Sequence, residues 1–123
     1  MFFWNPYTGK NRLARNVGGI PTVVTNSVAT SALNSRDFEQ MVAVDLDPAV
    51  AGSELFFWSP VTGKNRLVLS AGGVPAYVMN MISASQISNR RFSQVLPGDF
   101  NPADDGEELL FWNLSSGASL LVP

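Results

Sequence analysis

Lysines and carboxylates are the side chains in this chain whose types and spacing could do chemistry. Gly9-Lys10 and Gly63-Lys64 look like the end of a phosphate-binding loop, and five acids lie within Asp99–Glu108. The 123 residues contain neither histidine nor cysteine. Their absence removes the commonest general base, the commonest zinc ligand, the thiolate nucleophile and every disulfide. Catalysis by this chain would have to rely on carboxylates or lysines.

The two Gly-Lys pairs do not complete a phosphate-binding loop. That loop also needs a glycine five places before the second glycine, and Ser or Thr after the lysine. Neither Gly9 nor Gly63 has the earlier glycine, and asparagine follows each lysine. We therefore expect both pairs to close hairpin turns, where this residue chemistry is common.

The acids of Asp99–Glu108 do not follow the spacing of an EF-hand loop, because Ala103 occupies its fifth place. We expect a solvated connection, with a bound cation and a paired-carboxylate glycosidase site as the alternatives left open. Asn113-Leu114-Ser115 matches the glycosylation sequon. Since no nucleophile or phosphate motif is found, we predict that the chain is not an enzyme. No catalytic, metal-binding or cofactor-binding residue is assigned.

The elements that must position these residues recur with a period of 54. Phe2–Leu13 returns as Phe56–Leu67, and a third copy begins at Leu110-Phe111-Trp112. Residues 2–54 align with 56–108 without a gap, at 24 identities in 53 pairs. We predict tandem 54-residue repeats that form one compact unit. Their ranges are 1–54 for repeat 1, 55–108 for repeat 2 and 109–123 for a partial repeat 3, which supplies a closing strand.

Each repeat is predicted to be mainly β. Its aromatic run favours a strand, and the Pro and Gly that follow favour a turn, so residues 2–13 are expected to form a β-hairpin. A Gly-Gly pair then precedes a third strand at 20–24, repeated at 74–78. We expect the acidic tails, Asp45–Glu54 and Asp99–Glu108, to be exposed connections.

The segments Ser27–Val42 and Met81–Leu96 admit two predictions. One is a short helix in each repeat, over about Ser35–Met41 and Asn89–Val95, capped by Ser35 or Asn89. The other is an irregular extended segment, because serine and asparagine are frequent there.

Three tryptophans, spaced 54 residues apart, stand at the same place in the three copies. They could pack successive repeats together or anchor a protein interface. With Tyr7 and Tyr77 they could instead stack on sugars, which would make the chain a carbohydrate-binding or other adhesive repeat module. Arg12 and Arg66 could meet an acidic partner or keep an edge strand from mispairing. The candidate interface or repeat-packing residues are Phe3, Trp4, Phe57, Trp58, Phe111, Trp112, Arg12 and Arg66.

The charge and hydropathy pattern bears on partners and location. Only 15% of residues are charged and the net charge is −2, whereas proteins that hold nucleic acid usually carry a basic excess. No apolar run approaches the roughly 20 residues of a membrane-spanning helix, and no signal peptide is recognised. We expect neither nucleic acid nor membrane as a partner.

The low charge, the duplication and the Asn, Ser, Val and Gly content together resemble small structural proteins of tailed bacteriophages, such as capsid decoration (cement) or fibre proteins. The resemblance covers the general character of the whole chain rather than a motif. It implies a non-enzymatic virion protein, made in the host cytoplasm, that stabilises a capsid or tail. It also implies a homo-oligomer, for which a trimer is one arrangement, seated on a larger viral protein shell.

Overall fold

In the computed structural model, the described residues are 2–25, 28–34, 36–46, 53–71, 74–79 and 81–122. They divide into two units, Met1–Phe38 and Glu39–Pro123. Both units are built from antiparallel sheets, so the chain is mainly β as expected. Among the described residues, no helix is long and apolar enough to cross a membrane.

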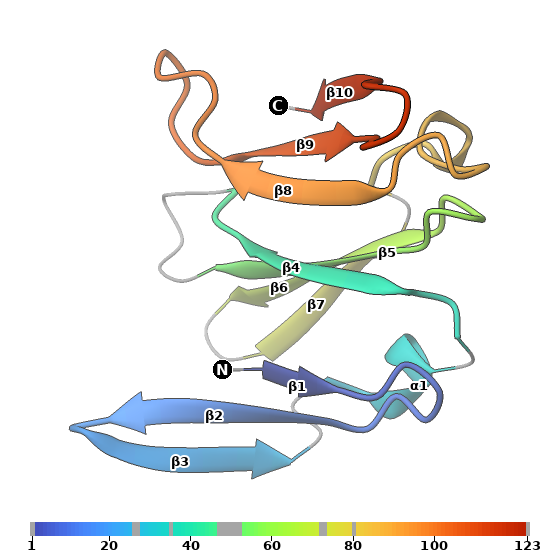
Figure 1. Cartoon of the computed structure of the whole chain (residues 1–123). Coiled ribbons are helices and arrows are strands. Elements are labelled where there is room, and N and C mark those ends of the chain that lie inside the picture. Colours follow the sequence, from blue (N-terminus) through green and yellow to red (C-terminus); the bar gives the residue numbers. More distant parts are fainter. Residues whose placement is uncertain are drawn as a thin grey trace. The chain divides into compact units, whose positions relative to one another are not determined.

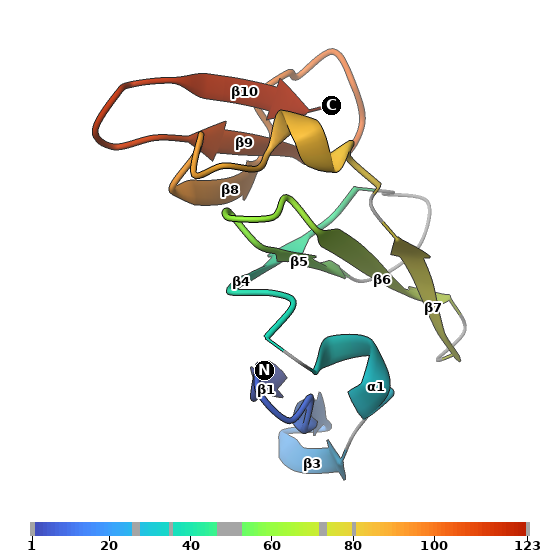
Figure 2. The same ribbon diagram turned by 90° about the vertical axis from the view of Figure 1, so that its right-hand side faces the viewer.

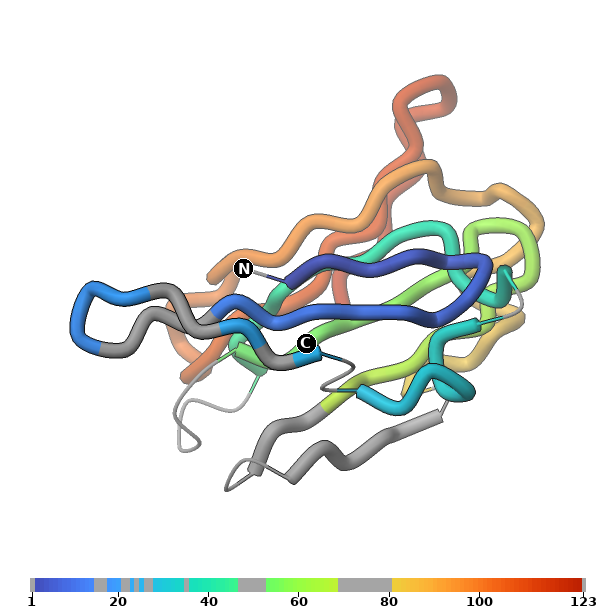
Figure 3. Tube along the Cα trace, turned by 90° about the horizontal axis from the view of Figure 1, so that it is seen from below, coloured from blue at the N-terminus to red at the C-terminus, as the bar shows by residue number. Residues whose placement is uncertain are grey.

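The first unit is a three-stranded sheet of order β1-β2-β3. Its strands are β1 (Phe2–Trp4), β2 (Asn11–Val17) and β3 (Ile20–Thr25). The β1–β2 hairpin and the third strand lie where the sequence predicts them, and Figure 3 shows β1 running back along β2. Because cross-strand partners project to the same face, Phe3 and Arg12 share one face of this sheet.

The turn that joins β1 to β2 is closed by its own polar groups. Asn5 Oδ1 accepts hydrogen bonds from the backbone N–H groups of Tyr7 and Thr8, at 2.9 and 3.2 Å. Gly9 has φ +71°, a left-handed conformation that suits glycine. The short helix α1 (Thr30–Leu33) lies beside this turn (Figure 2), and a Cβ atom on Gly9 would stand only 2.0 Å from the Thr30 carbonyl oxygen.

The second unit contains two sheets, drawn in Figure 1. One has the order β4-β5-β6-β7 and the other the order β10-β9-β8. A short 3₁₀ helix, η1 (Ala84–Gln86), precedes β8. The strands are β4 (Gln40–Val44), β5 (Glu54–Trp58), β6 (Asn65–Ala71), β7 (Val74–Met79), β8 (Gln94–Gly98), β9 (Glu108–Trp112) and β10 (Ser119–Val122).

The core of the second unit combines side chains from both of its sheets. Phe111 of β9 lies at 6.1 Å from Phe56, 5.0 Å from Trp58 and 5.9 Å from Phe92, measured between ring centroids. Phe56, Trp58 and Phe111 are fully buried. The remaining buried members of this core are Val44, Leu67, Ile82, Ile87, Phe92, Val95 and Leu109.

The predicted helices over Ser35–Met41 and Asn89–Val95 are wrong. The helical turns come earlier, at Thr30–Leu33 and Ala84–Gln86, and Gln40 and Gln94 each begin a strand instead. Arg36 and Arg90 break the helical path with φ of 55° and 52°, and their N–H groups bond to the carbonyls of Pro6 and Pro60. Ser35, the proposed cap, lies outside the described residues.

The predicted exposed tails are correct only in part. Asp99, Asp104 and Asp105 are exposed, but Glu54 and Glu108 are buried at 4% and 3% exposure and begin strands β5 and β9. The cost of burying these two carboxylates is offset by the backbone hydrogen bonds that they accept from the preceding loop. Residues 47–52 of the first tail lie outside the described residues.

Candidate functional site

The indole groups of Trp4 and Trp58 make the same hydrogen bond in the two units. Trp4 Nε1 donates to the Leu33 carbonyl at 3.1 Å, and Trp58 Nε1 donates to the Ile87 carbonyl at 3.0 Å. Trp58 is fully buried, so it offers no ring surface to a sugar. Each indole instead ties the first strand of its hairpin to the C-terminal end of the helical turn, at the last residue of α1 or the residue that follows η1.

Two buried asparagines, Asn11 and Asn65, lie 54 residues apart in the sequence and make the same set of hydrogen bonds. Asn11 Nδ2 donates to the carbonyls of Gly9 and Val28, and Asn11 Oδ1 accepts from the Val28 N–H. Asn65 makes the corresponding three bonds with Gly63 and Ile82, at 2.8–3.0 Å. We did not single out these asparagines from the sequence, although the identity of Asn11 and Asn65 within the aligned repeats was a usable signal.

The turn amides leave little for a phosphate to bind. In the second hairpin, Thr62 N–H donates to Ser59 Oγ, Gly63 N–H to the Ser59 carbonyl and Lys64 N–H to Thr62 Oγ1. The first hairpin uses the corresponding amides in the same way. Because a phosphate loop needs backbone N–H groups aimed at the ligand, these Gly-Lys turns have the geometry of closed hairpin turns.

The predicted interface residues fall into different environments. Phe57, Trp58 and Phe111 are fully buried, whereas Trp4, Trp112 and Arg66 are partly buried. Phe3 is 54% exposed and Arg12 is exposed as well. Only Phe3 and Arg12 of the predicted set therefore present both an open side chain and a shared sheet face.

Of the two tyrosines named as possible sugar platforms, Tyr7 is the one whose side chain the structure describes. Tyr7 is 60% exposed, but the guanidinium of Arg36 lies over its ring at 4.3 Å from the centroid. That stacking is a cation–π contact and covers one face of the ring. The side chain of Tyr77 lies outside the described residues.

The exposed face of the first sheet continues beyond Phe3 and Arg12. Arg12 pairs with Thr25, and Ala14 pairs with Val23 two residues further along the strands, so these side chains project to the same side. Val23 is 57% exposed. A hollow of about 390 Å³ is lined by Phe3, Arg12, Ala14 and Val23. We call these four residues the aromatic–basic face.

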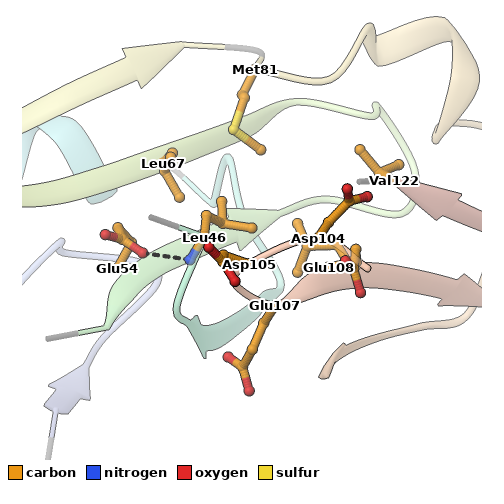
Figure 4. A pocket seen from close by; sticks show the side chains of 10 residues that line it. Leu46, Glu54, Leu67, Met81, Asp104, Asp105, Glu107, Glu108 and Val122 are labelled. Carbon is orange, nitrogen blue, oxygen red and sulfur yellow. Dashed lines mark hydrogen bonds between the residues drawn. The ribbon is translucent and has the colours of Figure 1, made fainter. Parts of the chain in front are cut away.

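A second hollow, of about 460 Å³, lies in the second unit and is shown in Figure 4. Its apolar wall combines Leu67 of β6, Leu109 of β9 and Val122 of β10 with Leu46 and Met81. Its acidic side chains are those of Glu54, Asp104, Asp105, Glu107 and Glu108. We call this hollow the acid-rimmed cavity.

The carboxylates of the acid-rimmed cavity have two kinds of role. Glu54 Oε2 accepts from the Leu46 N–H at 2.9 Å, and Glu108 Oε2 accepts from Phe100 and Asn101 at 2.7 and 3.3 Å. Asp104 and Asp105 are exposed at the mouth. In the described part of the chain, no group of three acids could hold a metal ion. The buried glutamates hold loops in place, and the exposed aspartates give the cavity its outward charge.

No protein-family model, no curated protein sequence and no solved structure matches this chain.

Proposed function

We propose that the chain is a non-enzymatic structural protein that acts by forming β-rich assemblies with copies of itself. We further propose that it consists of tandem 54-residue units, with residues 109–123 as a closing partial unit. The observation that supports both is the pairing of strands between successive repeats. The last strand of repeat 1 pairs with the first strand of repeat 2, and the last strand of repeat 2 pairs with the first strand of the partial repeat.

The two pairings have the same register. Gln40 lies opposite Trp58 in the first, and Gln94 lies opposite Trp112 in the second. The Trp58 carbonyl also accepts from the Glu39 N–H and the Trp112 carbonyl from the Ser93 N–H, at 3.0 and 2.9 Å. A unit that takes a strand from its neighbour is incomplete alone, as in other repeat proteins. Such construction favours proteins that work by stacking units and associating with neighbours.

The resemblance to capsid decoration and fibre proteins supports the proposal that this assembly is located on a virion. On this proposal the chain is a virion protein that decorates or stabilises a capsid or tail, as a homo-oligomer for which a trimer is one arrangement. Its partner beyond itself is then a larger viral protein shell. Virions from a culture that makes this chain should contain it at high copy number by mass spectrometry, and virions without it would contradict the virion role.

Self-association is the property that tests the proposal first. The 13.3 kDa chain should show a molar mass by light scattering that is a multiple of the single-chain mass and rises with concentration. Urea at concentrations below the unfolding transition should leave the β-sheet circular dichroism unchanged. A single-chain mass at every soluble concentration would refute the assembly proposal.

A further inference from the structure

The formal charge is divided unequally between the two units. Residues 1–38 contain four basic residues and one acid, a net charge of +3, and residues 39–123 contain nine acids and four basic residues, a net charge of −5. The total is the −2 of the whole chain. Because the two net charges are opposite, the positive unit of one copy attracts the negative unit of a neighbouring copy. The same attraction steers the approach of one copy to another.

The positive unit carries an exposed apolar surface beside its charge. Phe3 and Val23, at 54% and 57% exposure, flank Arg12 on the aromatic–basic face. Aromatic residues and arginine are enriched at the centres of protein interfaces and supply much of their binding energy. The face therefore has the composition of a docking surface whose partner is apolar and negatively charged.

The negative unit carries a hollow of the matching kind. The acid-rimmed cavity has an apolar wall that includes Leu46, Met81 and Val122, with exposed Asp104 and Asp105 at its mouth. Its volume of about 460 Å³ lies within the roughly 300–1,000 Å³ of pockets that hold small-molecule ligands, so it has room for an aromatic side chain. An aromatic ring can pack against the apolar wall of this cavity. A guanidinium beside it can then donate paired hydrogen bonds to a carboxylate, in the bidentate geometry that arginine favours.

We propose that the aromatic–basic face of one copy docks at the acid-rimmed cavity of a second copy of this chain. This proposal rests on the proposed self-assembly and identifies the surfaces that carry it out. The contact joins two different surfaces, so it is heterologous. After the first contact the pair keeps one free face, on one copy, and one free cavity, on the other, so association continues until a ring closes or a filament grows.

Charge reversal on each surface tests the docking. Arg12→Glu reverses the face and Asp105→Lys reverses the cavity mouth; both side chains are exposed. Sedimentation velocity in about 0.01 M salt, where the Debye length is about 30 Å, should show that each variant associates at least about tenfold more weakly than the wild type. An equimolar mixture of the two variants should recover association, because the intact face of one meets the intact cavity of the other. The double variant should recover it too.

Two matched variants control for net charge. Arg91→Glu changes the chain's charge as Arg12→Glu does, and Glu39→Lys changes it as Asp105→Lys does, at exposed positions outside both surfaces. Both should associate like the wild type. Phe3→Ala should weaken association even in about 1 M salt, where charges are screened within about 3 Å, because apolar burial is not screened. Equal urea midpoints for all variants establish that folding is unchanged.

The outcomes separate the docking from the assembly itself. If the wild type associates and Arg12→Glu and Asp105→Lys associate equally well, the docking proposal is wrong while the assembly stands. If each single variant is weakened but neither the mixture nor the double variant recovers, the two surfaces do not meet each other. A wild type that stays a single chain overturns the assembly and the docking together.

Discussion

The ring of Phe111 stands edge-on to the indole of Trp58, with 5.0 Å between ring centroids and 83° between ring planes. The two residues come from different sheets of the second unit, on β9 and β5, and are both fully buried. An edge-to-face pair of this kind contributes about 0.5–1.5 kcal/mol beyond the apolar area that it buries. Strand β9 thereby contributes to the core of the second unit.

Removing the Phe111 ring should destabilise the second unit strongly. Phe111→Ala leaves a cavity against Phe56, Trp58 and Phe92, and we expect a loss of about 3–5 kcal/mol in the free energy of unfolding. Urea titration followed by tryptophan fluorescence measures this loss. Leu114→Ala, at a position that is 61% exposed, is the control and should change stability by less than about 0.5 kcal/mol. Equal effects of the two substitutions would contradict a core role for Phe111.

Two turn glycines separate the cost of backbone conformation from the cost of contact. Gly63 and Gly117 have nearly equal φ, +73° and +72°, but a Cβ atom would lie 2.0 Å from the Ala84 carbonyl oxygen at Gly63 and meet nothing within 4 Å at Gly117. Gly117→Ala should cost about 1–2 kcal/mol from its left-handed backbone alone. Gly63→Ala should cost roughly 1–3 kcal/mol more, because the η1 turn must move. Thermal unfolding of the two variants makes the comparison, and equal costs would show that η1 does not constrain this turn.

The buried side-chain amide of Asn65 should contribute more to stability than the small size of the side chain implies. Asn65→Ala removes three hydrogen bonds and leaves the N–H of Ile82 and the carbonyls of Ile82 and Gly63 without this partner. We expect a loss of at least about 3 kcal/mol, because each of the three buried groups left unsatisfied costs about 1–3 kcal/mol. Asn113→Ala is the control, since its bonds are exposed. Denaturant titration should rank Asn65→Ala well below Asn113→Ala in stability, and the reverse order would contradict the clamp.

The Glu108 carboxylate should hold the loop before β9. Glu108→Ala removes the acceptor for the Phe100 and Asn101 N–H groups, and about 1–3 kcal/mol of stability should be lost. Glu108→Gln keeps an acceptor oxygen and should lose less. Hydrogen exchange followed by NMR at the Phe100 amide distinguishes the two, with faster exchange in the alanine variant. Unchanged exchange would mean that this amide is protected by something other than Glu108.

Much of the local structure could be predicted from residues close in sequence. The hairpin at 2–13 and the strand that begins at Ile20 follow from aromatic runs, turn prolines and paired glycines. The helix prediction failed at Ser35–Met41 and Asn89–Val95, where local preference was weak. There the partner strands, Glu54–Trp58 and Glu108–Trp112, impose an extended backbone on Gln40 and Gln94. Tertiary pairing of this kind routinely overrides weak propensity.

The candidate interface residues also show the difference between what local sequence predicts and what tertiary packing decides. Phe3, Phe57 and Phe111 occupy equivalent sequence positions, yet Phe3 is 54% exposed and the other two are fully buried. Local sequence cannot distinguish them, because burial depends on what packs against a strand rather than on the strand itself. Likewise, the sequence around Glu54 and Glu108 predicts solvated acids. In the structure their carboxylates accept hydrogen bonds from the backbone N–H groups of Leu46 and Phe100.

By itself, the sequence determined the 54-residue period, the mainly β character and the hairpin turns, because these depend on residue type and short spacing. Only the tertiary structure decided that β4 pairs with β5 and β8 with β9, that Phe111 packs in the core beside Trp58, and that Phe3 is exposed beside Arg12. Strand pairing and burial depend on groups brought together from distant parts of the chain. Their free energy comes from contacts and desolvation that no short stretch of residues contains.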